Sequence, residues 1–153
     1  MATRTRNPGT RHAGGDWLAT CAITPDAVHR AWAAGELALV PSGGHWLAVE
    51  APFGATLDAM QRIPADVLGP VLGYPAAERA WWLVPLAAGE QLDDVARLVV
   101  HPAGWPLYCP PVQRPAHGRV WLERPDGTGQ LTDPSTLGAA FGPGGRLPAE
   151  AFG

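Results

Sequence analysis

The sequence contains no lysine, so every basic side chain other than histidine is an arginine. It is also poor in charge: Asp, Glu, Lys and Arg make up 16% of the 153 residues, and the formal net charge is −3 at pH 7. A domain whose main task is to clamp a phosphate backbone is usually basic. The charge balance therefore argues against strong sequence-independent binding of nucleic acid, and leaves a local basic surface open. The missing lysine also excludes a Walker-type phosphate loop, which requires that residue.

Cysteine and long apolar runs are scarce as well. Cys21 and Cys109 are too few for a disulfide framework or a cysteine-rich zinc site. The five histidines are scattered, so surface or capping roles are expected for them rather than a metal site. No apolar run reaches about 18 residues, which predicts no membrane span. The first residues are basic with no apolar stretch behind them, which is not typical of a secretory signal, so a cytoplasmic location is expected.

The chain divides into three parts by composition. Residues 1–15 are basic, glycine-rich and without periodicity, which predicts a flexible arm. Residues 16–142 are long enough for a single domain, and seven tryptophans favour a true hydrophobic core. Residues 143–153 are predicted to be a disordered tail.

Turn residues and periodicity predict an α+β domain in which helices flank a mixed or antiparallel sheet. Thr24 and Asp133 are each followed by proline, the typical start of a helix. Two further helices are expected at 56–63 and 90–96. Strands are expected at 36–40, 45–49, 69–74, 80–84, 98–100, 106–109 and 118–122. The turn at 41–44 predicts that the first two of these strands pair as a hairpin within 36–50.

The stretch RAWWLVP (79–85) indicates a buried strand that ends at a proline. Successive side chains of a strand point to opposite faces, so Trp81 and Trp82 predict that both faces of the sheet are covered. Arg79 stands at the first position of this strand, where strands of this kind can carry a catalytic residue.

Several segments occur in the order of a known family. They are a helix with Ala31-Trp32, LAVEAP (47–52), GPV (69–71), RAWWLVP (79–85) and VVHPAGWPLYCPPVQRPAHGRVWL (99–122). From about Pro25 to Val120 the chain resembles the primase–polymerase domain at the N-terminus of bifunctional DNA primase/polymerases of the archaeo-eukaryotic primase type. The resemblance implies an RRM-derived fold, a role in DNA replication, and nucleotide or nucleic-acid partners.

The resemblance also implies where the site should lie. The family's strand with two alternate aspartates, which hold divalent metal ions, falls on Ala48 and Glu50, so one carboxylate is lost. The family's phosphate-contacting histidine falls on Arg79, and its third acidic position falls near Val99, where no carboxylate stands. Glu50 and Arg79 are therefore the candidate remnant catalytic residues, Glu50 the candidate metal ligand, and Arg79 and His101 the candidate nucleotide-binding residues.

Three functions follow from these residues. The first is a degenerate primase/polymerase-like domain that binds a nucleotide, a nucleic acid or a protein without catalysis. The second is an active nucleotidyltransferase, in which Mg or Mn is held by Glu50 together with another acidic group such as Asp58. The third is a protein-interaction domain unrelated to primases, which would expose Trp46, Trp105 or Trp121 as a partner patch, although the core is the more usual place for these rings.

Overall fold

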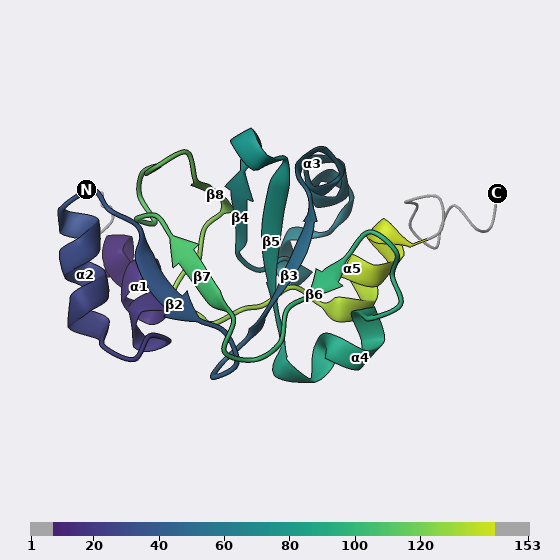
Figure 1. Ribbon diagram of the computed structural model, residues 1–153, viewed down its shortest axis with the longest axis horizontal. Coiled ribbons are helices and arrows are strands. Elements are labelled where there is room, and N and C mark those ends of the chain that lie inside the picture. Colours follow the sequence, from purple (N-terminus) through teal and green to yellow (C-terminus); the bar gives the residue numbers. More distant parts are fainter. Residues whose placement is uncertain (1–7, 143–153) are drawn as a thin grey trace.

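A five-stranded sheet in the order β6-β3-β5-β4-β8 forms the centre of the protein, and all of its strand pairs are antiparallel. The computed structural model describes residues 8–142, and Figure 1 shows their arrangement. The strands of this sheet are β3 (Leu47–Pro52), β4 (Val71–Tyr74), β5 (Arg79–Val84), β6 (Val99–Val100) and β8 (Val120–Glu123). The RAWWLV strand β5 is thus the middle strand, paired along both of its edges.

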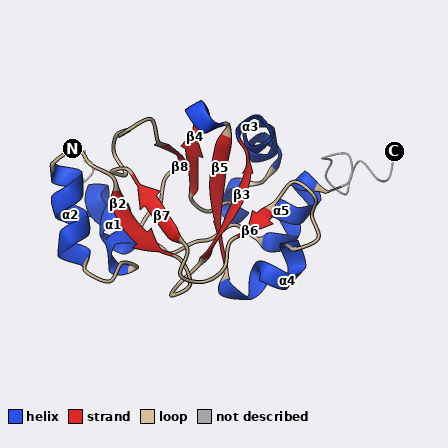
Figure 2. Cartoon of the chain, viewed as in Figure 1, coloured by secondary structure: helices blue, strands red, loops and turns tan. Residues whose placement is uncertain are grey.

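Other elements cover both faces of this sheet (Figures 1 and 2). On one side lie α1 (Pro8–Thr20), α2 (Pro25–Ala33) and a two-stranded antiparallel sheet of β2 (Ala38–Pro41) and β7 (Pro106–Cys109). On the other side lie α3 (Phe53–Arg62), α4 (Gly89–Leu92) and α5 (Pro134–Phe141). Single turns of 3-10 helix occupy Ala65–Val67, Pro75–Ala77 and Leu86–Ala88. The predicted α+β class is confirmed, with antiparallel sheets flanked by helices.

Two hydrophobic cores lie on opposite faces of the central sheet. Trp81 belongs to the core shared with α1, α2, β2 and β7, whereas Trp82 belongs to the core under α3, α4 and α5. Both rings are buried, and the indole Nε1 of Trp82 donates to Thr56 Oγ1 at 3.1 Å. The prediction that the two neighbouring tryptophans face opposite sides is therefore confirmed.

The predicted hairpin within 36–50 is wrong. The first strand pairs with β7 and the second with β5 and β6, so the chain passes from one sheet to the other between them. The connecting turn is bonded to a distant turn instead: Ser42 N donates to Trp105 O at 2.9 Å, and Gly104 N donates to Ser42 O at 2.7 Å. The fully buried ring of Trp46 holds the chain between the two sheets. Tertiary pairing has replaced the local pairing that a short turn favours.

The predicted flexible arm at 1–15 is also wrong over its second half, because helix Pro8–Thr20 includes it. The helix has little amphipathic pattern, and its stability comes from packing rather than from periodicity. Leu18 is fully buried, and Gly14 lets the helix backbone approach the carbonyl of Pro125 so closely that a Cβ would lie 1.9 Å from that oxygen. Gly14, one of the glycines that suggested flexibility, therefore serves close contact.

Both helix starts predicted after a polar cap are found. Asp133 caps α5, and its Oδ2 accepts a 2.9 Å bond from Thr136 N, whereas Thr24 stands at the cap of α2 without a side-chain bond. No helix within residues 8–142 is both long and apolar enough to cross a membrane. Residues 1–7 of the predicted arm and the predicted tail at 143–153 lie outside the described residues.

Candidate functional site

Glu50 lies on β3, on the face of the central sheet that looks toward β2 and β7. In the antiparallel register Glu50 is opposite Trp81 of β5, and Arg79 of the same strand is opposite both Pro52 of β3 and Tyr74 of β4. Residues that are directly opposite one another, or two apart along one strand, share a face. The strand pairing therefore brings Glu50, Arg79, Trp81 and Tyr74 together on one surface.

The Glu50 carboxylate is surrounded by donors from the protein. Arg79 Nη1 donates to its Oε2, Trp81 Nε1 donates to its Oε1 at 3.2 Å, and the Nε2–H of His101 donates to the same Oε1 at 2.9 Å. Glu50 and His101 are mostly buried, whereas the side chain of Arg79 is 55% exposed. We call Glu50, Arg79, Trp81 and His101 the Glu50 cluster.

These contacts decide the charge of the carboxylate. Burial alone would raise the pKa of Glu50, but the hydrogen bond from His101, the charge of Arg79 and the indole of Trp81 together outweigh it. The pKa of Glu50 is therefore lowered below its ordinary value, and the group is ionised at neutral pH.

His101 follows directly after β6 and is held from two sides. Its backbone N–H donates to Ala48 O at 3.0 Å, which continues the pairing with β3. Its ring stacks on Trp105 with the centroids 3.8 Å apart and the planes 7° from parallel. Trp105 in turn lies 6.2 Å from the ring of Trp81. The imidazole is thus fixed in direction, with one ring nitrogen aimed at Glu50.

Arg119 extends the same surface and is a residue that sequence reasoning missed. Its guanidinium lies 4.8 Å over the ring of Tyr74 and 4.7 Å over that of Trp81, and its Nη1 donates to Tyr108 O at 2.9 Å. Burial lowers the pKa of Arg119 from its high ordinary value. The only signal in the sequence is the glycine before it, Gly118, which has φ +79° and places the turn against Tyr74.

The structure brings together the three candidate site residues named from the sequence: Glu50, Arg79 and His101. Their predicted roles in catalysis and nucleotide binding stay predictions. Asp58, the acidic group considered as a second metal ligand, is exposed on α3, which covers the other face of the sheet. Within residues 8–142 no three His, Cys, Asp or Glu side chains gather in a way that could hold a metal ion.

The tryptophans considered for a partner patch are not gathered on the surface. Trp46 is 1% exposed and Trp121 is 5% exposed, and both belong to the core between the two sheets. Trp105 is half-buried, with one face against His101. The usual placement of such rings in a core is confirmed for Trp46 and Trp121.

Comparison of the chain with protein-family models, with curated proteins and with solved structures finds no match. The geometry of the Glu50 cluster is therefore the basis on which a function is proposed.

Proposed function

We propose that this chain is a primase/polymerase-like domain that has lost metal-dependent catalysis and binds nucleotides or single-stranded nucleic acid at the Glu50 cluster. The observation that carries the proposal is that the oxygens of Glu50 accept hydrogen bonds from Arg79, Trp81 and His101. The proposal keeps the cytoplasmic location that the sequence predicts.

The sheet register supports the primase-like part of the proposal. The resemblance places three acidic positions at Ala48, Glu50 and Val99, which are far apart in the sequence. In the fold, Val99 is the register partner of Glu50, and Ala48 lies two residues before Glu50 on the same strand face. Three positions that the resemblance assigns to one metal site are thus neighbours on one surface, although only one of them carries a carboxylate.

Hydrogen-bond donors of the protein surround the one carboxylate that the resemblance assigns to a metal site. Divalent metals require several oxygen ligands, and one carboxylate is a weak site. Here Arg79 forms an ion pair with Glu50, and His101 donates a hydrogen bond to the same carboxylate. An arginine can bind a phosphate through its remaining donors while it keeps one bond to a carboxylate.

The surroundings add positive charge beside two aromatic rings, the half-buried Tyr74 and the buried Trp81. Arg79 stands opposite Tyr74 in the sheet, and the guanidinium of Arg119 lies over the ring of Tyr74. Among the described residues Arg79 pairs with no carboxylate other than Glu50, and Arg119 pairs with none. Proteins that bind single-stranded nucleic acid commonly use positive side chains for the phosphates and aromatic rings for the bases.

The two alternatives find less support. An active Mg- or Mn-dependent nucleotidyltransferase needs a second acidic ligand near Glu50, and Asp58 lies on the helix layer across the sheet. A protein-interaction domain built on exposed tryptophans is not favoured, because Trp46 and Trp121 are buried.

Fluorescence anisotropy with a labelled oligothymidylate and a labelled nucleotide tests the proposal. Arg79→Gln is expected to weaken binding by about tenfold, since a hydrogen bond to a charged group contributes roughly 1.5–3 kcal/mol. Arg97→Gln is the matched control, because Arg97 lies over Phe141 in the opposite core. Exchange of Mg²⁺ for a chelator at constant ionic strength should change nothing. Equal loss in both variants, absence of binding, or primer extension in Mg²⁺ or Mn²⁺ would contradict the proposal.

A further inference from the structure

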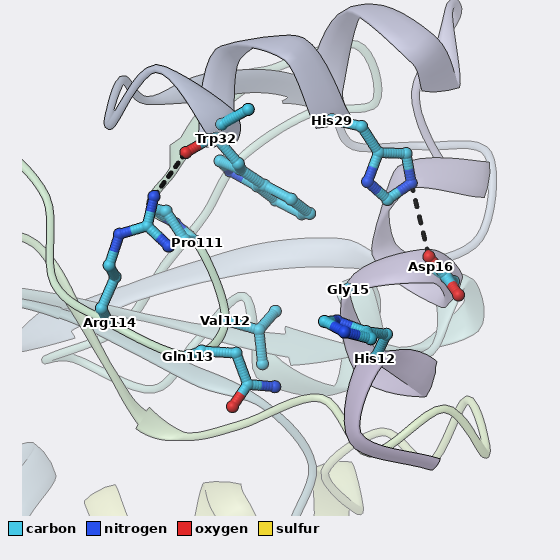
Figure 3. A pocket seen from close by; sticks show the side chains of 10 residues that line it. His12, Gly15, Asp16, His29, Trp32, Pro111, Val112, Gln113 and Arg114 are labelled. Carbon is cyan, nitrogen blue, oxygen red and sulfur yellow. Dashed lines mark hydrogen bonds and ion pairs between the residues drawn. The ribbon is translucent and has the colours of Figure 1, made fainter. Parts of the chain in front are cut away.

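A pocket of about 510 Å³ lies between α1, α2 and the segment that follows β7. Figure 3 shows Trp32 on one side of this space and Val112 facing it, with Arg114 at one end and the His29–Asp16 pair at the other. None of the residues of the Glu50 cluster lines the pocket. Its size falls within the roughly 300–1,000 Å³ that small-molecule sites occupy.

Gly15 keeps this pocket open. A glycine within a helix costs about 1 kcal/mol relative to alanine, so it calls for a reason. For Gly14 the reason is the close approach to the Pro125 carbonyl, but a Cβ on Gly15 would meet only Trp32, at 3.4 Å, and Val112, at 3.9 Å. Backbone packing therefore does not require a glycine at position 15. A larger side chain there would enter the space between Trp32 and Val112.

The wall of the pocket is apolar and partly aromatic. The Nε1 of Trp32 is already used, because it donates to Cys109 O at 3.0 Å, so the indole offers only hydrocarbon surface to the pocket. Val112, Pro111 and Ala33 continue this surface. Such a wall favours the flat apolar body of a ligand.

One end of the polar rim has an arginine without an ion-pair partner. Arg114 Nη2 donates to the carbonyl of Trp32 at 2.6 Å, and no carboxylate among the described residues forms an ion pair with its guanidinium. At the opposite end the Oδ1 of Asp16 lies 3.4 Å from the Nε2 of His29. The end of the pocket at Arg114 therefore lacks an anion.

We propose that this pocket binds a small aromatic carboxylate, with the ring between Trp32 and Val112 and the carboxylate on Arg114. The guanidinium is planar and presents paired donors that match a carboxylate. The apolar wall takes the ring, and the Asp16–His29 pair closes the far end of the site. This site is independent of the proposed function, because the two share no residue.

NMR of the ¹⁵N-labelled protein tests the site with 2-naphthoate and its neutral counterpart 2-naphthamide. The chain has seven tryptophans, and the Trp32→Phe variant identifies the indole N–H signal of Trp32. Naphthoate is expected to shift that signal in a saturable way, and naphthamide to bind at least tenfold more weakly. No shift at millimolar naphthoate, equal binding of the two probes, or shifts centred on Trp81 and Trp105 would overturn the proposal.

Two variants separate the parts of the site. Arg114→Gln should reduce naphthoate binding to the level of naphthamide, while Arg30→Gln on the exposed surface of α2 should leave it unchanged. Gly15→Leu should abolish binding of both probes by filling the pocket, with Gly54→Leu, at an open position, as its control. If Gly15→Leu fails to fold, Arg114→Gln decides, and unchanged naphthoate binding in that variant overturns the proposal.

Discussion

Glu50 and Arg79 lie on adjacent antiparallel strands, diagonal to each other in the register, and their side chains form an ion pair on one face of the central sheet. Long side chains reach each other across such a diagonal. Trp81, directly opposite Glu50, and His101, which follows directly after β6, complete the shell of the carboxylate. The carboxylate therefore pairs with Arg79 and accepts hydrogen bonds from Trp81 and His101.

Replacing this carboxylate should strengthen the binding of nucleic acid. Glu50→Gln removes the negative partner of Arg79 and His101 and raises the net charge of the surface by one unit. We expect the affinity for oligothymidylate to rise severalfold at low ionic strength, and the gain to shrink as salt is added. Anisotropy titrations over a salt series measure both effects. A weaker complex in Glu50→Gln would show that the carboxylate itself takes part in binding.

The lowered pKa of Glu50 predicts a pH-dependent contribution to stability. A carboxyl whose folded pKa lies below its unfolded pKa stabilises the fold above the unfolded value, and loses that contribution as the pH falls through the folded value. Wild type should therefore exceed Glu50→Gln in free energy of unfolding at pH 7, and the difference should vanish under acid conditions. Urea denaturation from neutral pH downward measures this. A difference that grows as the pH falls below 4.5, the ordinary pKa of the group, would contradict the expected direction.

Val99 offers a way to rebuild a metal site. It is 53% exposed and is the register partner of Glu50, so Val99→Asp places a second carboxylate on the same face. We expect this variant to gain Mn²⁺ binding that the wild type lacks, with an affinity in the millimolar range. Leu57→Asp, at an exposed position of α3, is the control and should gain nothing. Calorimetric titration with MnCl₂ distinguishes these outcomes. Equal Mn²⁺ affinity of the two variants would show that position 99 does not form a metal site with Glu50.

The two neighbouring glycines of α1 should respond oppositely to alanine. Gly14→Ala would place a Cβ 1.9 Å from Pro125 O, so we expect a loss of about 1–3 kcal/mol or more in unfolding free energy. Gly15→Ala meets Trp32 at an ordinary 3.4 Å, and the higher helix propensity of alanine should stabilise the protein by up to about 1 kcal/mol. Thermal and urea denaturation measure both. Equal destabilisation would mean that α1 does not pack on Pro125 as described.

Much of the fold could be predicted because its elements carry strong local signals. The prolines after Thr24 and Asp133 marked the starts of α2 and α5, and the apolar run at 80–84, which ends at a proline, marked β5 with its two opposed tryptophans. α1 escaped prediction because it has little hydrophobic periodicity and its packing depends on glycine contacts with a loop more than a hundred residues away. The β2–β7 pairing escaped for the same reason, since no local pattern indicates a partner so distant in the sequence.

The residues of the candidate site were predicted only in part. Glu50, Arg79 and His101 were named because of the resemblance to a known family, and the sheet register explains why they meet. Arg119 was not named, because its role depends on the pairing of β8 with β4, which places it over Tyr74 and Trp81. Nor does any local feature of the sequence indicate that residues 111–114 form one wall of a pocket with α1.

The most direct test of the account is Mn²⁺ binding to the wild-type protein, followed by electron paramagnetic resonance of the free ion. It asks whether Glu50, which accepts hydrogen bonds from Arg79, Trp81 and His101, still binds a metal ion. The expected result is no saturable site at submillimolar Mn²⁺, together with oligothymidylate binding that the ion does not alter. A saturable Mn²⁺ site in the wild type that disappears in Glu50→Gln would show instead that this carboxylate still serves as a metal ligand.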